Sequence, residues 1–307
     1  MSGKGSFENQ YPDYDQNTTQ TLLKSKDAIS EAFQKKLNNF KTSKLQYLTT
    51  NLQKEIFHDG TVYTGSAGLS LYYLMTAIGN PDMCNDYLQV TSAILASGKQ
   101  FSAQTKSQSP LLWQWHDKVY LGAAHGMAGI LYMLLQAAEY IKSNELRLFV
   151  KPSIDWLLSL RFSSGNFPSS LGSSSGDRLV QWCHGAPGLV PLCITAYKIF
   201  KEEKYLKTAL QCGEVVWERG LCTKGYSICH GVSGNTYAFL QLYQITKKPV
   251  HLYRACCFME WCALERPGSQ LHQPDRPASL FEGLLGRIYL AEDINKPMDA
   301  LFPAFCL

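Results

Sequence analysis

WCHGAPGL, residues 182–189, returns in altered form as ICHGVSGN, residues 228–235. Each copy places a Cys-His pair directly before a Gly-x-x-Gly step, and the step occurs three more times without the cysteine, as TGSAG, HGMAG and EGLLG. A step that recurs at an interval long enough for two helices and their loops is typical of a repeat architecture. The first glycines of the five copies are Gly65, Gly126, Gly185, Gly231 and Gly283.

A nearly all-apolar run of about ten residues follows each step, and its Leu, Ala and Met content favours a buried helix over a strand. Amphipathic segments come next in the chain. Residues 205–221, YLKTALQCGEVVWERGL, gather apolar side chains near one face, and residues 251–264, HLYRACCFMEWCAL, follow a similar pattern. Each repeat therefore predicts an apolar inner helix and an amphipathic outer helix. The apolar face of the first segment comprises Leu206, Leu210, Val215 and Trp217.

Helical hairpins stacked side by side form either an open solenoid or a closed ring. The inner helices show too little polarity for the wet face of an open solenoid, and strand signals are scarce. We therefore predict an all-α fold, an α/α toroid of helical hairpins. In a toroid every inner helix starts at the same end, so the five steps are expected to meet there. Free N–H groups at those helix starts would favour anions.

The N-terminal segment, residues 1–62, differs from the repeats. Its apolar residues recur at helical spacing and predict one long amphipathic helix packed outside the toroid, with Ser25 or Asp27 as N-cap. The remaining residues, 63–307, form the predicted toroid, and the whole chain is predicted to be a single domain. Within the toroid, the polar residues 98–110 are a predicted surface loop. The apolar positions of the helix are Ile29, Phe33, Leu37, Phe40, Leu48 and Leu52.

Composition and charge narrow the function classes. The chain has 307 residues and a formal net charge of +4, and it lacks the basic run with interleaved aromatic residues that indicates nucleic-acid binding. It has neither a secretory leader nor an apolar run of about 18 residues, so we expect a cytoplasmic protein with at most peripheral membrane association. The ten cysteines are spread along the chain, many in apolar helical stretches, which predicts reduced, buried thiols in a reducing compartment.

Side chains that bind metals or act in catalysis gather at the steps. The position before the first glycine holds histidine in three copies and glutamate in one, and a cysteine precedes two of the histidines. Cysteine thiolate and imidazole are the preferred ligands of zinc, and two cysteines with one histidine leave a fourth position open. Two other interpretations stay open from the residues alone: buried thiols beside histidines bonded to backbone carbonyls, or Cys-His catalysis without a metal. The side chains are His125, His184, His230, Glu282, Cys183 and Cys229.

Longer motifs around the steps resemble those of the eukaryotic LanC-like proteins, relatives of the bacterial lanthionine synthetase C enzymes, and most of all those of the first mammalian paralogue. The motifs are GAAHGMAG (122–129), QWCHGAPG (181–188), KGYSICHG (224–231) and SLFEGLLG (279–286), and the likeness extends over nearly the whole chain. The resemblance implies a toroid with one Zn²⁺ at its mouth. It places the zinc ligands at Cys183, Cys229 and His230, and it implies that His184 is not a ligand.

The resemblance also implies a reaction. In the family, zinc holds the thiol of glutathione as a thiolate, which adds to electrophilic small molecules or to dehydroamino acids in peptides and proteins. His125 matches an acid/base residue, Lys224 matches a basic residue that contacts glutathione, and Asp275 ends a second glutathione-contacting stretch. His272 stands where that stretch has an arginine. We therefore expect a zinc-dependent glutathione transferase that forms thioethers.

One departure from the family bears on activity. Family members carry seven hairpins, whereas this sequence shows five steps, and the region between Gly65 and Gly126 lacks a Gly-Asp-Ala-Gly step with its aspartate. The chain is therefore predicted to be a shortened form. The alternative function is a non-catalytic glutathione-binding scaffold or signalling protein, with an SH3-domain partner as in the family. A carbohydrate-active helical ring would need paired carboxylates, and only Glu282 stands at a step.

Overall fold

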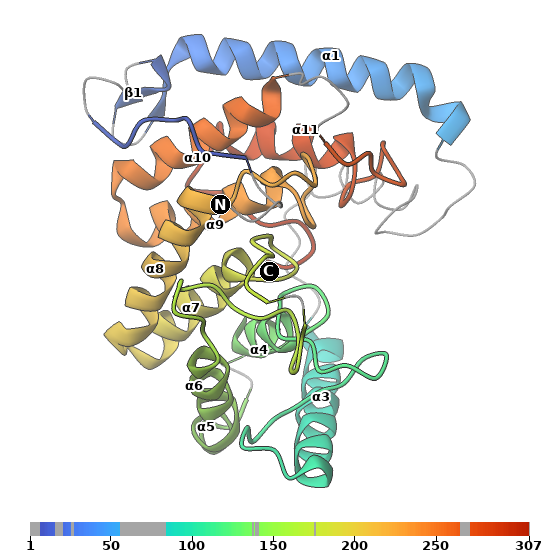
Figure 1. The fold of residues 1–307 in the computed structure, drawn as a ribbon, viewed down its shortest axis with the longest axis vertical. Helices are drawn as coiled ribbons and strands as arrows, with labels where there is room; N and C mark the ends of the chain where they lie inside the picture. Colours follow the sequence, from blue (N-terminus) through green and yellow to red (C-terminus); the bar gives the residue numbers. More distant parts are fainter. Residues whose placement is uncertain are drawn as a thin grey trace. The chain divides into compact units, whose positions relative to one another are not determined.

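A computed structural model describes residues 7–15, 21–25, 28–55, 84–136, 138, 141–174, 176–264 and 271–306; for residues 45, 48–55 and 84–93 it describes the backbone alone. The described chain is mostly helical, with a two-stranded antiparallel sheet near its start (Figure 1). In chain order the elements are β1 (Leu23–Ser25), β2 (Ala28–Ile29), α1 (Glu31–Glu55), α3 (Cys84–Thr105), α4 (Met127–Gln136), α5 (Ser143–Glu145), the π-helical η2 (Leu146–Val150), α6 (Lys151–Ser159), α7 (Ala186–Phe200), α8 (Glu203–Arg219), α9 (Val232–Thr246), α10 (Pro249–Ala263) and α11 (Leu284–Asp293).

The chain divides into two compact units. The terminal unit joins Met1–Ile78 with Val216–Cys306, and the central unit comprises Gly79–Val215 with Leu307. The boundary falls inside α8, which gives its first part to the central unit and its last residues to the terminal unit. The predicted boundary between residues 62 and 63 lies outside the described residues and stays a prediction.

The predicted inner helices begin where the steps place them. In the four described copies, α4, α7, α9 and α11 each start at the residue after the first glycine of the step. The first copy, at Gly65, lies outside the described residues. The helix starts therefore confirm the repeat for these four copies. Within the described part of the chain, no helix combines the length and the apolar character needed to cross a membrane.

The second glycine of the step is required because the preceding loop folds back against the helix. A Cβ atom at Gly129 would lie 1.9 Å from the carbonyl oxygen of Ala123, in the central unit. A Cβ atom at Gly286 would lie 2.4 Å from the carbonyl oxygen of Leu280, in the terminal unit. Both distances are far below a van der Waals contact, so a side chain would push the loop away from the helix.

The same folded-back loop supplies hydrogen-bond partners to the helix starts. In each described copy the first N–H of the inner helix donates to an oxygen of the chain that precedes it. These four N–H groups are therefore not free for an anion, so the prediction of free N–H groups is wrong for the first residue of each of these helices. A loop carbonyl or amide takes the place that a solvent anion would take. The pairs are Met127 N to Tyr120 O (3.0 Å), Ala186 N to Asn166 Oδ1 (2.8 Å), Val232 N to Gly225 O (3.0 Å) and Leu284 N to Pro277 O (2.7 Å).

The first predicted outer helix, α8, is amphipathic, but its buried row differs from the predicted one. Val215 and Trp217 are buried as predicted, whereas Leu206 and Leu210 are half-buried. Two wholly buried side chains, Tyr205 and Ala209, lie one residue before these leucines, and the buried Cys212 continues their row at helical spacing.

The other predicted outer helix, α10, is buried on nearly all sides, and the prediction of an amphipathic helix is wrong for it. One face packs against α9. The N-terminal segment covers another: the Tyr253 hydroxyl donates to the carbonyl of Pro12 at 3.0 Å, and the Trp261 and Phe7 rings lie 5.8 Å apart. Contacts between residues so distant in the chain cannot be read from a hydropathy pattern. Within the terminal unit, α10 is therefore a core helix.

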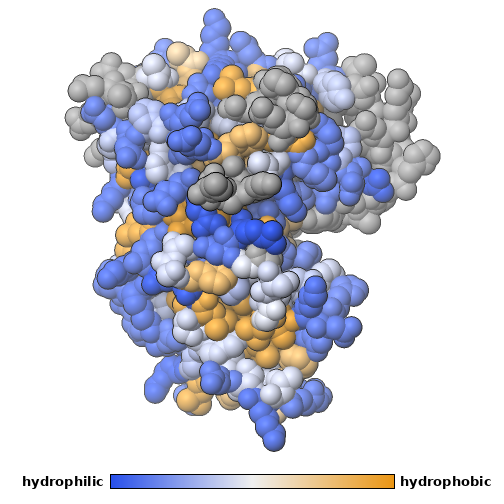
Figure 2. All heavy atoms as spheres, in the orientation of Figure 1, coloured by the Kyte–Doolittle hydropathy of each residue, from blue (hydrophilic) through white to orange (hydrophobic). Residues whose placement is uncertain are grey.

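The long helix α1 forms as predicted but begins later. Ile29 belongs to β2, and the N-cap is Ser30, whose Oγ accepts from the N–H of Phe33 at 3.1 Å. Of the predicted caps, Ser25 is wrong because it ends β1, and Asp27 lies outside the described residues. The apolar positions 33, 37 and 40 are buried as predicted, while the side chains at 48 and 52 lie outside the described residues. Figure 2 shows mostly hydrophilic side chains along the outer side of α1, at the top of the view.

In the central unit, α3 continues to Thr105, so the predicted loop at residues 98–110 is helical over its first part. Gly98 lets the Trp113 ring lie against α3: a Cβ atom there would be 2.5 Å from the ring. The indole Nε1 of Trp113 also donates to the carbonyl of Ile94 at 3.1 Å. The segment that follows α3 therefore packs on the helix, and this contact supports its last turns.

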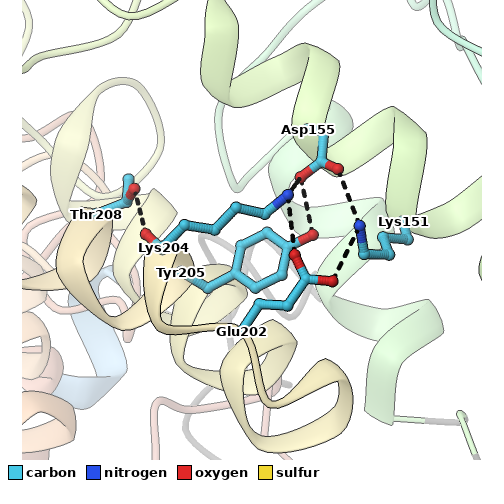
Figure 3. Close-up of polar contacts among 6 residues, drawn as sticks. All are labelled: Lys151, Asp155, Glu202, Lys204, Tyr205 and Thr208. Atoms are coloured by element: carbon cyan, nitrogen blue, oxygen red, sulfur yellow. Dashed lines mark hydrogen bonds and ion pairs between the residues drawn. The ribbon is translucent and has the colours of Figure 1, made fainter.

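Charged side chains at α6 and the start of α8 form a network within the central unit (Figure 3). Asp155 accepts from Lys204 and from the Tyr205 hydroxyl, each at 2.8 Å, and from Lys151 at 3.2 Å. Glu202 accepts from both lysines at 3.1 Å. Partial burial alone would raise the pKa of Asp155, but these hydrogen bonds outweigh it and hold the pKa below its usual value. The network joins the two helices by polar contacts.

The cysteines whose side chains are described form no disulfide, and all of them except Cys306 are buried. Burial raises the pKa of the thiols of Cys212, Cys222 and Cys257 to about 12. These three thiols therefore stay protonated at neutral pH and act as core side chains. The expectation of reduced, buried thiols is confirmed for the described cysteines.

Candidate functional site

In the central unit, the Cys-His pair of the third step sits in a tight turn. The backbones of Gln181 and His184 exchange two hydrogen bonds, at 3.2 and 3.0 Å, and the Gln181 side-chain amide donates to the Cys183 sulfur at 3.2 Å. The turn presses against the second step, because a Cβ atom at Gly122 would lie 2.0 Å from the Cys183 carbonyl oxygen. The buried Cys183 thiol is therefore held in a fixed position beside the second step.

His125 is exposed and belongs to an aromatic cluster in this unit. Its ring stacks on the Trp115 ring, with centroids 4.5 Å apart and an interplanar angle of 20°. The His184 ring lies 6.3 Å from the His125 ring, and the Tyr120 ring lies 5.7 Å from that of His184. The expected meeting of the steps is thus confirmed for the second and third copies, which bring His125, Cys183 and His184 together.

Trp115 was not predicted as a site residue. It is displayed by a two-residue hairpin turn: Trp115 and Lys118 exchange backbone hydrogen bonds at 2.9 and 3.1 Å. His116 and Asp117 between them have positive φ angles of 45° and 59°, a left-handed conformation that suits such a turn but strains residues other than glycine. The indole stays 48% exposed while one face covers His125. The sequence signal that could have identified Trp115 was an aromatic residue directly before a His-Asp pair.

In the terminal unit, the fourth step lies against the fifth. The N–H of Cys229 donates to the carbonyl of Phe281 at 2.9 Å, and the N–H of His230 reaches the Ser227 hydroxyl at 3.3 Å. Cys229 is buried and His230 half-buried. Burial raises the pKa of the neighbouring Glu282 carboxyl, and the His230 imidazole offsets part of this rise. The meeting of these two copies is confirmed within this unit.

A cavity of about 480 Å³ opens beside these two steps, within the terminal unit. It is lined by Lys224, which is exposed, by the half-buried Glu282 and by His272. The N–H of His272 donates to the carbonyl of Thr223 at 3.1 Å, which ties the 271–277 loop to the turn that carries Lys224. Asp275 is exposed on the same loop and is not among the residues that line the cavity.

Two further basic residues line the cavity and were missed from the sequence. Arg287 of α11 is nearly buried: its guanidinium donates to the carbonyl of Cys262 and lies 3.9 Å from the centroid of the Tyr226 ring. Lys44 comes from α1. An arginine inside an apolar inner helix was a signal for Arg287, whereas nothing in the sequence of α1 marks Lys44. The remaining lining residues are Tyr47, Leu271, Gln273, Pro274, Pro277, Gly283 and Leu284.

The side chains that could hold a metal are thus distributed over both units. Cys183 belongs to the central unit, and Cys229 with His230 belongs to the terminal unit. A set of two thiols and one imidazole suits zinc and leaves one coordination position for a substrate. Both thiols are buried and lie in hydrogen-bonded turns: the Gln181 amide donates to the Cys183 sulfur, and the Cys229 N–H donates to the Phe281 carbonyl.

Comparison with known proteins identifies relatives. Residues 17–307 match the family described as "Lanthionine synthetase C-like protein". The chain is 47% identical over 220 residues to "Glutathione S-transferase LANCL1" of Danio rerio, which covers 71% of this chain and 54% of the relative. It is 38% identical over 221 residues to "LanC-like protein GCL1" of Arabidopsis thaliana, covering 70% and 50%. The chain therefore spans about half the length of these curated relatives.

A solved structure shares the fold. "Nisin cyclase" superimposes with a TM-score of 0.53 at 19% sequence identity, covering 86% of this chain and 69% of the other. At this sequence identity, the structural similarity is evidence for the fold alone. Together with the family match it confirms the predicted fold class, a helical toroid built from hairpins.

Proposed function

Because the chain belongs to the lanthionine synthetase C-like family, we propose that it is a glutathione transferase that activates the glutathione thiol for addition to electrophiles, dehydroamino acids in peptides among them. The observation that carries the proposal is the basic cavity beside the fourth and fifth steps, where Lys224 and Glu282 line one space. The printed name of the Danio rerio relative, a glutathione S-transferase, supports glutathione as the substrate. Reduced thiols agree with a cytoplasmic setting, where glutathione is found.

We propose Cys183, Cys229 and His230 as the ligands of one zinc ion. Their support is the donor chemistry described above and their place in the repeated steps of the family. When bound there, zinc would keep a substrate thiol deprotonated at neutral pH. His184 shares the turn of Cys183 through its backbone, so its proposed role is structural.

Other residues of the chain would bind glutathione and donate the proton that the reaction needs. Lys224 would pair with a carboxylate of glutathione through a charge-assisted hydrogen bond. Asp275, on the loop tied to the Lys224 turn, would contact the same ligand from outside the cavity lining. As the thiolate forms a C–S bond at the β-carbon of a dehydroamino acid, the α-carbon must take a proton, and His125 would donate it. The Trp115 ring, stacked on His125, would hold the imidazole in one orientation.

The proposal is tested by conjugation of glutathione to a dehydroalanine peptide and to chlorodinitrobenzene. We expect turnover by the wild-type chain and a loss of at least about 100-fold in Cys229→Ala, because removal of a ligand removes thiol activation. Ser233→Ala, which alters a buried residue at the start of α9, just after the fourth step begins, and no proposed ligand, is the control. Equal turnover in the wild type and in Cys229→Ala would refute a zinc-dependent transferase.

One observation favours a second candidate function. The chain spans about half the length of its curated relatives, and the family's Gly-Asp-Ala-Gly step with its aspartate has no counterpart in the sequence. A chain that keeps the cavity without turnover would serve as a glutathione-binding scaffold, with an SH3 domain as the candidate partner. Glutathione binding without conjugation to either electrophile would support this function over the first.

A further inference from the structure

Trp115 is an exposed tryptophan beside the proposed proton donor. Within the central unit its ring stacks on that of His125, with centroids 4.5 Å apart, and the rings of His116 and Tyr120 lie 4.2 and 5.8 Å from it. Even with these neighbours, Trp115 stays 48% exposed. Tryptophan is highly buried on average, so the exposed indole leaves a large apolar surface open to a ligand at His125.

A strained but braced turn holds Trp115 in this place. Two-residue hairpin turns favour Asn-Gly or Asp-Gly, because both central residues take a positive φ. Here His116 and Asp117 occupy those positions, with φ angles of 45° and 59°. After the turn, residues 119–121 pair with residues 169–171 through backbone hydrogen bonds of 2.9 and 3.0 Å. Backbone strain of this kind persists where the surrounding structure supports it, and it gathers at sites that bind ligands.

The separation of His125 and Trp115 matches the spacing of neighbouring residues in a peptide. A dehydroamino acid that takes its proton from His125 must lie against the imidazole. Neighbouring Cα atoms of a peptide are about 3.8 Å apart, and the two ring centroids are 4.5 Å apart. The side chain next to the reacting residue would therefore reach the indole. An aromatic side chain gains most there, because aromatic rings attract one another beyond the burial of their surface.

We propose that Trp115 is a substrate-binding residue for the acceptor: its exposed indole stacks on an aromatic side chain next to the dehydroamino acid. The inference rests on the proposed function, because it names the acceptors that the site prefers. This contact is separate from the orientation of His125 by the same ring. Stacking on the acceptor determines which peptides bind, whereas the orientation of the imidazole affects the rate of proton transfer.

The test measures binding, by calorimetry, of two unreactive peptides to the full chain. Both peptides have alanine at the reacting position. One has phenylalanine on each side of this alanine, and the other has cyclohexylalanine, which is of similar size and apolar but has no aromatic ring. Burial of apolar surface alone gives the phenylalanine peptide no advantage, so a preference for it reports stacking. We expect the wild type to bind the phenylalanine peptide about 5-fold more tightly.

We expect Trp115→Leu to lose this preference and Trp115→Phe to keep at least about 2-fold of it. Leu148→Ala, which alters an exposed apolar residue of η2 in the same unit, is the control and should match the wild type. The preference is a ratio of two affinities, so a displaced His125 does not remove it.

A wild-type chain that binds neither peptide, or binds both equally, would overturn the proposal, and so would a preference that survives in Trp115→Leu. Neither peptide can react, so the transferase function is judged separately. The preference without conjugation of glutathione leaves the Trp115 assignment standing. Conjugation without the preference leaves the transferase standing and refutes the assignment.

Discussion

The two Cys-His-Gly steps are alike in sequence but differ in how their helix starts are stabilised. At the third step, the first N–H of α7 donates to the side chain of Asn166, a wholly buried residue that also donates to Asp177 at 2.7 Å. At the fourth step, the first N–H of α9 donates to a backbone carbonyl, that of Gly225. The third step also has Gly185 at φ +112°, whereas Gly231 has φ −116°, which any residue adopts.

This difference shows that a sequence repeat fixes the position of an element without fixing the contacts that hold it. Both steps start an inner helix at the same position of the motif. At the fourth step the loop backbone is sufficient, while at the third step a side chain 20 residues earlier in the chain supplies the bond. The two helix starts are therefore expected to respond differently to substitution.

The largest effect is expected at Gly185. Gly185→Ala combines an unfavourable φ with a Cβ atom 2.2 Å from the Leu179 carbonyl oxygen, so we expect the free energy of unfolding to fall by roughly 4 kcal/mol. Gly172→Ala is the control, because Gly172 has φ +67° but no atom within 4 Å of the added Cβ, and it should lose only about 1 kcal/mol. Urea denaturation measures both. Equal losses would show that crowding by the loop contributes nothing.

Asn166→Ala is expected to have the next largest effect. It leaves the buried N–H of Ala186 and the carbonyl of Leu179 without the partner that Asn166 gives them, and we expect a loss of about 3 kcal/mol. Ser164→Ala, which removes a single hydrogen bond to the Asn166 backbone, should lose less than about 1 kcal/mol. If Asn166→Ala unfolds at the wild-type urea concentration, the two helix starts do not differ as described.

The two units also differ in the pKa of an aspartate, which is raised at Asp293 of the terminal unit and lowered at Asp155 of the central unit. Asp293 gives the larger expected effect on the free energy of unfolding. Burial raises the pKa of Asp293 to about 7, and the carboxyl accepts from the Tyr237 hydroxyl at 2.8 Å and the Leu301 N–H at 3.2 Å. Because the folded protein holds this proton to a higher pH than the unfolded chain, this group's contribution to stability falls as pH rises from about 4 to 7. We expect a loss on the order of 3 kcal/mol over that range.

Asp293→Asn removes this titration while it keeps an acceptor for both donors. The difference in unfolding free energy between variant and wild type, measured by urea denaturation at several pH values, should therefore grow in favour of the variant from pH 4 to 7. A difference that does not change with pH would refute the raised pKa.

The smallest effect is expected at Asp155 of the central unit, whose pKa is held below its usual value. Its contribution to stability is present above the pKa of an unfolded aspartate and is lost as pH falls through the lower folded value. Because the side chain is 35% exposed, we expect Asp155→Asn to cost less than about 1 kcal/mol at pH 7 and nothing at pH 2. A loss that persists at pH 2 would mean that packing, not charge, holds α6 to α8.

The sequence was most informative at positions where the structure accepts few residue types. Glycines at the steps predicted the starts of α4, α7, α9 and α11, because only glycine tolerates the close approach of the loop at Gly129 and Gly286. The residues before those glycines gave the candidate ligands, since cysteine and histidine are the residue types that zinc prefers.

The sequence was least informative where the outcome depends on contacts between distant segments. The burial of α10 depends on Phe7 and Pro12, more than 200 residues away in the chain. The stacking of Trp115 on His125 depends on a strained turn, and the place of Lys44 in the cavity depends on how α1 packs against α11. None of these follows from hydrophobic periodicity, which reports which face of a helix is covered but not by what.

The central claim, that Cys183, Cys229 and His230 bind zinc, is tested most directly by elemental analysis of the purified, monodisperse protein. We predict about one zinc per chain in the wild type, the same in Cys222→Ala, and near none in Cys229→Ala. Cys222 is the matched control, because it is a buried thiol of the terminal unit whose pKa is raised to about 12 and whose sulfur is engaged by the Asn235 amide at 3.1 Å. Wild-type protein without zinc, or zinc retained in full by Cys229→Ala, would contradict the account.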